Sequence, residues 1–252
     1  MNIFLALVIS LGINLLMFIP AFILKTDKLT DISYSITFIV LVLYSFFIND
    51  VSLLTILLLI MVVIWAIRLG GYLLIRIRKI GKDKRFDDRR ENFFSFLKFW
   101  ILQGVSVFFI MIPILLFMNI ENKEFNFLVV FGIIIWLGGL ILESVADYQK
   151  YKFINDPLNK DKWIDKGVWK YSRHPNYLGE MMIWIGLYLF MLPSFSFGQS
   201  IFGLMGPLYI ILLINFVSGI PLLEKGANKK WGNNIEYKSY KKRVGILLPK
   251  FF

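Results

Sequence analysis

Residues 51–67, VSLLTILLLIMVVIWAI, decide the fold, because this run has no charged side chain and is long enough to cross most of a lipid bilayer as a helix. Similar runs lie on both sides of it. Of the whole chain, 58% is hydrophobic, and the mean hydropathy is +0.68. This composition excludes a soluble enzyme and places the 252-residue chain among integral membrane proteins.

A window of about 19 residues finds further apolar runs along the chain. With the first, they cover residues 4–24, 32–48, 51–67, 96–118, 125–142, 178–192 and 203–223. Only Asn49 and Asp50 separate the second run from the third, which predicts a tight helical hairpin. The first run is long and lacks a basic start and a cleavage site, so we interpret it as a mature helix. The sequence therefore predicts an all-α fold with seven transmembrane helices in one domain, residues 1–252.

The basic residues fall on one side of this topology. If the runs cross alternately, Lys123 is the one exception among the 28 Lys and Arg residues. Basic loops stay in the cytoplasm, so we expect the N-terminus outside and the C-terminus inside. The net charge of +11 is then mostly topogenic, and we expect no nucleic-acid partner. The inner connections are long and polar, so we expect any aqueous site at the cytoplasmic face.

The chain contains no Cys and a single His. This excludes disulfides, cysteine nucleophiles and metal sites built from several imidazoles, so we expect no metal. The sequence Gly-x-Gly-x-x-Gly is also missing, which excludes a classical Rossmann domain. Difficult chemistry would therefore come from a diffusible cofactor with anionic groups.

The segment 166–180, KGVWKYSRHPNYLGE, leads directly into the sixth run. Pro175 presets the start of a helix, and Asn176 is a favoured N-cap residue. Arg173 and His174 stand just before this start, where helix amides attract anions. These two residues could also be ordinary interfacial side chains.

Three further clusters carry polar side chains at helical spacing. Asn176 and Glu180 share a face, although Glu180 could instead pair with a nearby lysine. A second stripe, which could also be a solvated face, follows the fifth run. It consists of Glu143, Asp147 and Tyr151. A third stripe extends the third run into the cytoplasm with Arg68, Tyr72 and Arg76.

The C-terminal tail is basic and rich in tyrosine. Tyr237 and Tyr240 lie three residues apart among lysines and arginines. The tail could lie on the bilayer as an amphipathic helix, or it could fold back over the site.

Several strings, in this order and spacing, resemble the bacterial branch of the steroid 5α-reductase family from about Asp31 to the C-terminus. They are IRLGGY (67–72), KDKRF (82–86), Glu143-x-x-x-Asp147, WKYSRHPNYLGE (169–180) and GIPLLE (219–224). The resemblance implies a seven-helix fold in the bacterial inner membrane whose cytoplasmic half binds NADPH. It also implies hydride transfer to the carbon β to a carbonyl in a lipid-like enone, while an acidic group polarises the carbonyl oxygen.

The resemblance also implies a cofactor site. Asn176 and Glu180 match the family's cofactor-binding pair, and Asp147 matches an acidic cofactor contact. We expect further residues of these clusters and of the tail to surround the nucleotide. They are Arg68, Tyr72, Glu143, Arg173, His174, Tyr177 and Tyr240.

The carbonyl-binding pair of the family is a Glu on the second helix and a Tyr on the third. A count from Arg68 places Asp31 and Trp65 at these positions, and we take them as the catalytic pair. Asp31 could donate a proton if burial raises its pKa. Trp65 has only an indole N–H and cannot replace a phenol as an acid. This departure from the family argues against a steroid as the substrate.

Two other functions remain open. Isoprenylcysteine carboxyl methyltransferases and phospholipid methyltransferases, which use S-adenosylmethionine, share an Arg-His-Pro-x-Tyr string and a related fold. The longer string ending in Glu180 and the KDKRF loop favour the reductase. A non-catalytic lipid-binding membrane protein is the remaining alternative. A nucleotide needs several Arg and Lys residues, whereas S-adenosylmethionine needs an acidic and aromatic cradle, so charge distinguishes the first two.

Overall fold

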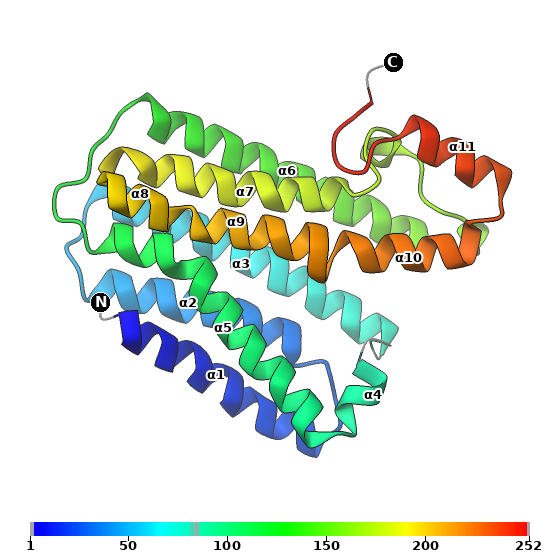
Figure 1. The fold of residues 1–252 in the computed structure, drawn as a ribbon, viewed down its shortest axis with the longest axis horizontal. Coiled ribbons are helices and arrows are strands. Elements are labelled where there is room, and N and C mark those ends of the chain that lie inside the picture. Colours follow the sequence, from blue (N-terminus) through cyan, green and yellow to red (C-terminus); the bar gives the residue numbers. More distant parts are fainter. Residues whose placement is uncertain (1–2, 82, 84–85, 251–252) are drawn as a thin grey trace. The chain divides into compact units, whose positions relative to one another are not determined.

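The computed structural model describes residues 3–81, 83 and 86–250, and its secondary structure is helical, with one isolated β-bridge between Ser172 and Gly245 (Figure 1). Seven helical segments among these residues are long and apolar enough to span a membrane, which confirms the predicted all-α class. Six of them contain α1 (Ile3–Ile23), α2 (Thr30–Phe47), α3 (Leu53–Ile80), α5 (Phe93–Met118), α6 (Phe127–Asn155) and α7 (Pro175–Met191).

The seventh segment, Phe197–Trp231, is interrupted. It contains α8 (Phe197–Gly203), α9 (Met205–Leu212), a π-helical turn (Leu213–Val217) and α10 (Ile220–Trp231). Gly219 separates the π-helical turn from α10, and a Cβ atom there would lie 2.6 Å from the carbonyl oxygen of Ile214. The other short elements include α4 (Asp87–Arg90), α11 (Ile235–Arg243) and the 3₁₀ turns Pro157–Asn159, Gly167–Lys170 and Leu192–Ser194.

Two helices extend well beyond their apolar runs. α3 begins at an N-cap, Ser52, whose hydroxyl accepts a hydrogen bond from the Thr55 amide, and it continues past residue 67 to Ile80. Gly81 ends it with a φ of 83°, a conformation that favours glycine. α6 likewise continues past residue 142 to Asn155. The predicted polar stripes therefore lie on continuous helices.

The described residues divide into two compact units. The N-terminal unit contains residues 1–126 and 191–206, and the C-terminal unit contains residues 127–190 and 207–252. Each unit is described separately.

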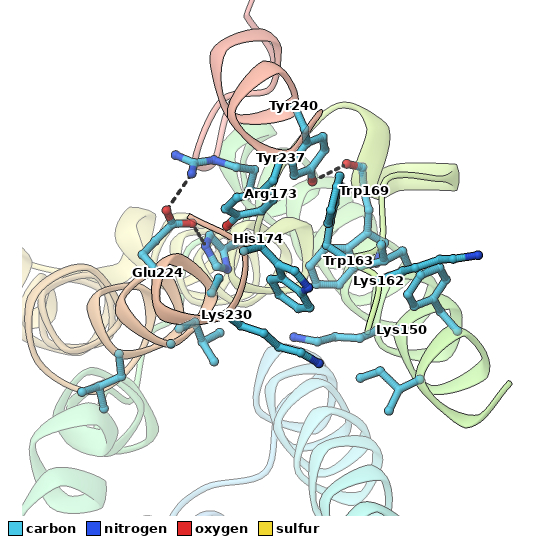
Figure 2. Close-up of a pocket in the computed structure, with 18 residues that line it drawn as sticks. Lys150, Lys162, Trp163, Trp169, Arg173, His174, Glu224, Lys230, Tyr237 and Tyr240 are labelled. Carbon is cyan, nitrogen blue, oxygen red and sulfur yellow. Dashed lines mark hydrogen bonds and ion pairs between the residues drawn. The ribbon is translucent and has the colours of Figure 1, made fainter. Parts of the chain in front are cut away.

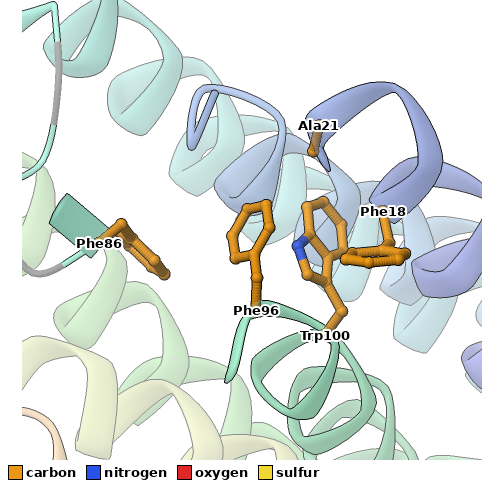
Figure 3. Close-up of a cluster of buried hydrophobic side chains, with 5 residues drawn as sticks. All are labelled: Phe18, Ala21, Phe86, Phe96 and Trp100. Atoms are coloured by element: carbon orange, nitrogen blue, oxygen red, sulfur yellow. The ribbon is translucent and has the colours of Figure 1, made fainter. Parts of the chain in front are cut away.

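The core of the N-terminal unit is aromatic (Figure 3). Phe18 of α1 packs against Phe96 and Trp100 of α5, with ring centroids 5.9 and 6.4 Å apart. Phe86 and Ala21 complete this buried cluster. Next to this cluster, the buried Arg90 of α4 pairs with Asp27, which lies between α1 and α2, and with Asp87 of α4 itself. The Asp27 pair connects α4 to the end of α1.

A buried polar network joins α1, α2 and α5. The Gln103 amide donates to Asn14 Oδ1 and Ser33 Oγ, both at 2.8 Å, and Asn14 Nδ2 donates to Thr37 Oγ1 at 3.2 Å. Interhelical hydrogen bonds of this kind stabilise helix packing inside a membrane, where apolar surface alone gives little driving force.

A seam of glycines joins α6 and α7 in the C-terminal unit. A Cβ atom at Gly139 would lie 2.6 Å from the Gly179 carbonyl oxygen, and one at Gly186 would lie 2.6 Å from the Trp136 nitrogen. Gly132 and Gly179 have equally close backbone neighbours. The two helices therefore run alongside each other at backbone contact (Figure 1), which only residues without a side chain permit.

Candidate functional site

The glycine seam places three carboxylates in the interior of the C-terminal unit. Glu143 and Asp147 on α6 are each 4% exposed, and Glu180 on α7 is 8% exposed. Asn176 Nδ2 donates to Asp147 Oδ1 at 3.2 Å, and Trp184 Nε1 donates to Glu180 Oε1 at 3.0 Å. The stripe formed by Glu143 and Asp147 is therefore buried and is not a solvated face.

The first turn of α7 differs from the sequence prediction, which took Asn176 as the N-cap residue. The helix begins at Pro175, so Asn176 lies in its first turn and its side chain bonds to Asp147 instead of capping the helix. The cause is Pro175, whose fixed φ suits the first helical position. The carbonyl of His174 accepts the first helical hydrogen bond, from the Leu178 amide at 3.1 Å.

The C-terminal segment holds the main chain of this turn. The amides of Arg173 and His174 donate to the carbonyls of Gly245 and Ile246 at 3.0 and 3.1 Å. The turn that carries the two basic side chains is therefore fixed by residues more than 70 positions later in the chain. This pairing is consistent with the fold-back alternative for the tail.

Glu224 of α10 binds both basic side chains of this turn. Arg173 Nη1 donates to Glu224 Oε2 at 2.6 Å, and His174 Nε2 lies 2.9 Å from Glu224 Oε1. Lys241 Nζ is 3.8 Å from the same carboxylate. Burial lowers the pKa of His174 below its ordinary value, although the hydrogen bond and charge of Glu224 oppose this shift.

Tyrosines of α11 pack on the loop that follows α6. Tyr237 and Tyr240 are buried and contact Trp163, with ring centroids 5.2 and 6.4 Å away. The Tyr240 hydroxyl donates to the Trp169 carbonyl at 3.0 Å, and burial raises the pKa of this phenol. Tyr240 therefore serves here as a neutral hydrogen-bond donor.

These elements enclose a cavity of about 370 Å³ within the C-terminal unit (Figure 2). α6, the loop after it, the turn before α7, α10 and α11 all contribute to its walls. Six aromatic residues line it, namely Phe153, Trp163, Trp169, Trp231, Tyr237 and Tyr240. Its basic lining consists of Lys150, Lys162, Arg173, Lys230 and His174.

The charge of the cavity is positive. Among the described residues that line it, Glu224 is the one acid, and Arg173 and His174 already bind its carboxylate. The Lys150 ammonium lies 4.9 Å from the centre of the Trp169 ring, and that of Lys230 lies 4.9 Å from the centre of the Trp231 ring. The walls therefore combine flat aromatic surfaces with ammonium groups and suit an anion that carries a planar ring.

Three of the predicted cofactor residues line this cavity, namely Arg173, His174 and Tyr240. Five others lie at the α6–α7 seam or the first turns of α7 in the same unit but not on the cavity wall: Glu143, Asp147, Asn176, Tyr177 and Glu180. The ring of Tyr177 stacks on that of His174, with centroids 5.8 Å apart, so this residue connects the two groups.

The remaining candidates, Asp31, Trp65, Arg68 and Tyr72, belong to the N-terminal unit. Asp31 Oδ2 is 3.7 Å from Arg76 Nη2, and the Arg68 guanidinium lies 5.7 Å from the centre of the Tyr72 ring. Trp65 is fully buried and meets the ring of Phe38 edge-on at 4.9 Å. Of the KDKRF string, residues 82, 84 and 85 lie outside the described residues, and Phe86 belongs to the aromatic core.

Sequence reasoning did not identify most of the cavity lining, including the charged residues Lys150, Lys162, Lys230 and Glu224 and the aromatic Trp163. Lys150 lies off the stripe of Glu143 and Asp147, so the helical spacing gave no signal for it. The loop and α10 come together only through tertiary packing, which helical spacing does not report. Glu224 ends the GIPLLE string, and this was the available signal for it.

No group of three or more metal-binding side chains occurs among the residues that the structure describes. The family described as "Protein of unknown function (DUF1295)" matches residues 17–244. Comparison with curated proteins and with solved structures gave no match.

Proposed function

The chain belongs to the DUF1295 family, and we propose that it is a membrane-embedded, NADPH-dependent reductase of a carbon–carbon double bond conjugated to a carbonyl in a lipid-like substrate. The aromatic and basic cavity of the C-terminal unit carries this proposal, as the site for the phosphates and a ring of the cofactor. Its volume of about 370 Å³ is near the lower end of the roughly 300–1,000 Å³ of ligand pockets, so it suits part of a dinucleotide.

The residues of the cavity fit a nucleotide phosphate. Lys150, Lys230 and Arg173 come from three different segments and would supply charged donors to phosphate oxygens. The rings of Trp163 and Tyr237 would provide surfaces for a base, and such stacking contributes about 1–3 kcal/mol per base. When bound, NADPH supplies the hydride of the reduction.

The same charges disfavour S-adenosylmethionine. Its sulfonium is a cation and needs a carboxylate or an aromatic cradle without competing ammonium groups. The one described acid of the cavity lining already binds Arg173 and His174. We therefore place the methyltransferase second.

The reduction also requires a proton. Hydride addition to the carbon β to the carbonyl leaves an enolate, which a group near the carbonyl oxygen must stabilise and a proton must then convert to the saturated ketone. Asp31 is the residue we assign to this role. Asp31 pairs with Arg76, so to act as a proton donor its carboxylate must leave the pair and first take up a proton from water. Trp65 would contribute only an N–H donor and apolar surface.

We propose that the cavity faces the cytoplasm, where reduced nucleotides are available, in a bacterial inner membrane. The support is the asymmetry of the basic residues, which leaves only Lys123 on the opposite side. Membrane lipids then surround the apolar helices.

Titration of the purified protein with NADPH and with S-adenosylmethionine tests the proposal. Three of the seven tryptophans, Trp163, Trp169 and Trp231, line the cavity, so a ligand bound there should quench part of the tryptophan fluorescence. We expect saturable quenching by NADPH and none by S-adenosylmethionine at the same concentrations. The reverse result would support the methyltransferase, and failure of both ligands to bind would support a non-catalytic lipid-binding protein.

A further inference from the structure

Glu224 is an unexpected residue on the wall of a cavity that suits anions. Its side chain is 18% exposed, and its two oxygens bind two different partners, Arg173 at 2.6 Å and His174 at 2.9 Å (Figure 2). It lies on α10, whereas its partners precede α7, so one carboxylate connects two separate parts of the wall.

Two roles are compatible with such a carboxylate, and they predict opposite effects on a phosphate ligand. As a simple counter-charge, Glu224 would compete with the ligand for Arg173, and its removal would strengthen anion binding. As a positioning group, it would hold the two side chains in their binding geometry, and its removal would weaken anion binding although the cavity becomes more positive.

The geometry favours the positioning role. Arg173 has five N–H donors and uses one of them on Glu224 at 2.6 Å, so the guanidinium can bind a second acceptor without leaving the first. The main chain of Arg173 is fixed by Gly245, and the Glu224 contact fixes the far end of its side chain. An arginine anchored at both ends loses little rotamer freedom when a ligand binds.

The hydrogen bond to Glu224 also determines which ring nitrogen of His174 carries the proton. With the Glu224 carboxylate as acceptor, Nε2 must carry the proton, and the ring orientation is then fixed. The charged and titratable groups that act on this ring are Glu224, Lys150 and Arg173, of which Glu224 is the one that stabilises the imidazolium.

We propose that Glu224 is a positioning residue for anion binding, which holds Arg173 and His174 on the cavity wall so that a phosphate ester binds more tightly with this acid present than without it. The identification of that ester as NADPH rests on the proposed function, but the positioning role does not.

The test compares Glu224→Gln, Glu224→Asp and a control, Glu236→Gln, in the full-length protein in lipid nanodiscs. Glu236 is an exposed acid of α11 that does not line the cavity, so its substitution changes the net charge equally. The probes are NADPH and inorganic pyrophosphate, followed by protein fluorescence. We expect Glu224→Gln to weaken both probes about tenfold and Glu236→Gln to change neither appreciably.

Glu224→Asp separates geometry from charge. It keeps the carboxylate but shortens the side chain by one methylene, so the positioning role predicts weaker binding at unchanged net charge. It also keeps the test informative if thermal unfolding shows that Glu224→Gln does not fold. Tighter or unchanged binding by Glu224→Gln, or wild-type binding by Glu224→Asp, would overturn the proposal.

A third readout does not depend on affinity. The chain has one histidine, so its imidazole NMR signal follows His174 alone. We expect the pKa of His174 to fall further in Glu224→Gln, since the group that opposes the effect of burial is lost. An unchanged titration would show that the contact is not formed.

The two probes separate this inference from the proposed function. If the wild-type protein binds pyrophosphate but not NADPH, the proposed function fails and pyrophosphate still tests Glu224. If it binds neither probe, the cavity is not an anion site and the positioning role is overturned as well.

Discussion

The proposed role of Asp31 as the proton donor can be tested directly by substitution. It lies in the first turn of α2 and pairs with Arg76 of α3 at 3.7 Å. We expect Asp31→Asn to lower turnover with an enone by about 100-fold or more, as loss of general acid catalysis does, because the amide cannot donate the proton. NADPH affinity should change little, since the cavity proposed to hold the cofactor is lined by residues of the other unit.

The matched control for this substitution is Asp88→Asn, an exposed acid of α4 in the same unit. It removes the same charge and should leave turnover unchanged. Equal turnover of Asp31→Asn and the wild type in a steady-state assay would remove Asp31 from the mechanism.

At the residue scale, the sequence predicted part of the site. Arg173, His174 and Tyr240 line the cavity, and they belong to the Ser-Arg-His-Pro-Asn string and the tyrosine-rich tail, which are recognisable locally. Their role in cofactor binding stays a prediction. Lys150 and Trp163 were missed. Trp163 reaches the cavity because the loop after α6 packs on Tyr237 of α11, and no spacing within either segment reports this packing.

At the scale of elements, the α6–α7 seam is the feature on which the buried carboxylates depend. A methyl group at Gly139 would lie 2.6 Å from the backbone of α7, so the helices would have to separate. We expect Gly139→Ala to lower the free energy of unfolding by about 1–3 kcal/mol, the usual cost of overpacking.

Gly138→Ala is the control for the seam, because its Cβ would meet only the flexible end of Met182, at 3.4 Å. This variant should be as stable as the wild type. Thermal unfolding in one detergent measures both variants, and equal stability of Gly139→Ala and Gly138→Ala would contradict the close approach of α6 and α7.

The extent of the helices shows what periodicity can and cannot predict. The apolar runs locate the seven described segments that are long and apolar enough to span a membrane, since a hydrophobic run of this length is itself the physical requirement for a span. Window hydropathy gives no signal beyond residues 67 and 142, but the four-residue spacing of the polar stripes predicts that both helices continue there. The spacing does not predict that α3 ends at Ile80 and α6 at Asn155. The π-helical turn before Gly219 lies within an apolar run, where window hydropathy gives no signal for it either.

At the scale of the whole molecule, the asymmetric distribution of basic residues predicts which ends of the helices face the cytoplasm. The absence of cysteine makes this directly testable, because each introduced thiol is the only one in the chain. We expect Asn233→Cys, in the exposed turn before α11, to be protected from a membrane-impermeant maleimide in intact cells. Glu121→Cys, in the exposed connection between α5 and α6, should react.

Permeabilised cells provide the control for this labelling, since both thiols should then react. Labelling of Asn233→Cys but not of Glu121→Cys in intact cells would reverse the orientation and place the cavity away from cytoplasmic nucleotides.

The central claim is that the basic and aromatic cavity of the C-terminal unit binds NADPH. The most direct measurement compares the NADPH dissociation constants of Lys150→Glu and Lys152→Glu, determined by fluorescence titration. Lys150 lines the cavity, whereas Lys152, two residues further along α6, is exposed and does not. The proposed site predicts at least about a tenfold loss of affinity, about 1.4 kcal/mol, for Lys150→Glu and wild-type affinity for Lys152→Glu. Equal affinities for the two variants would contradict it.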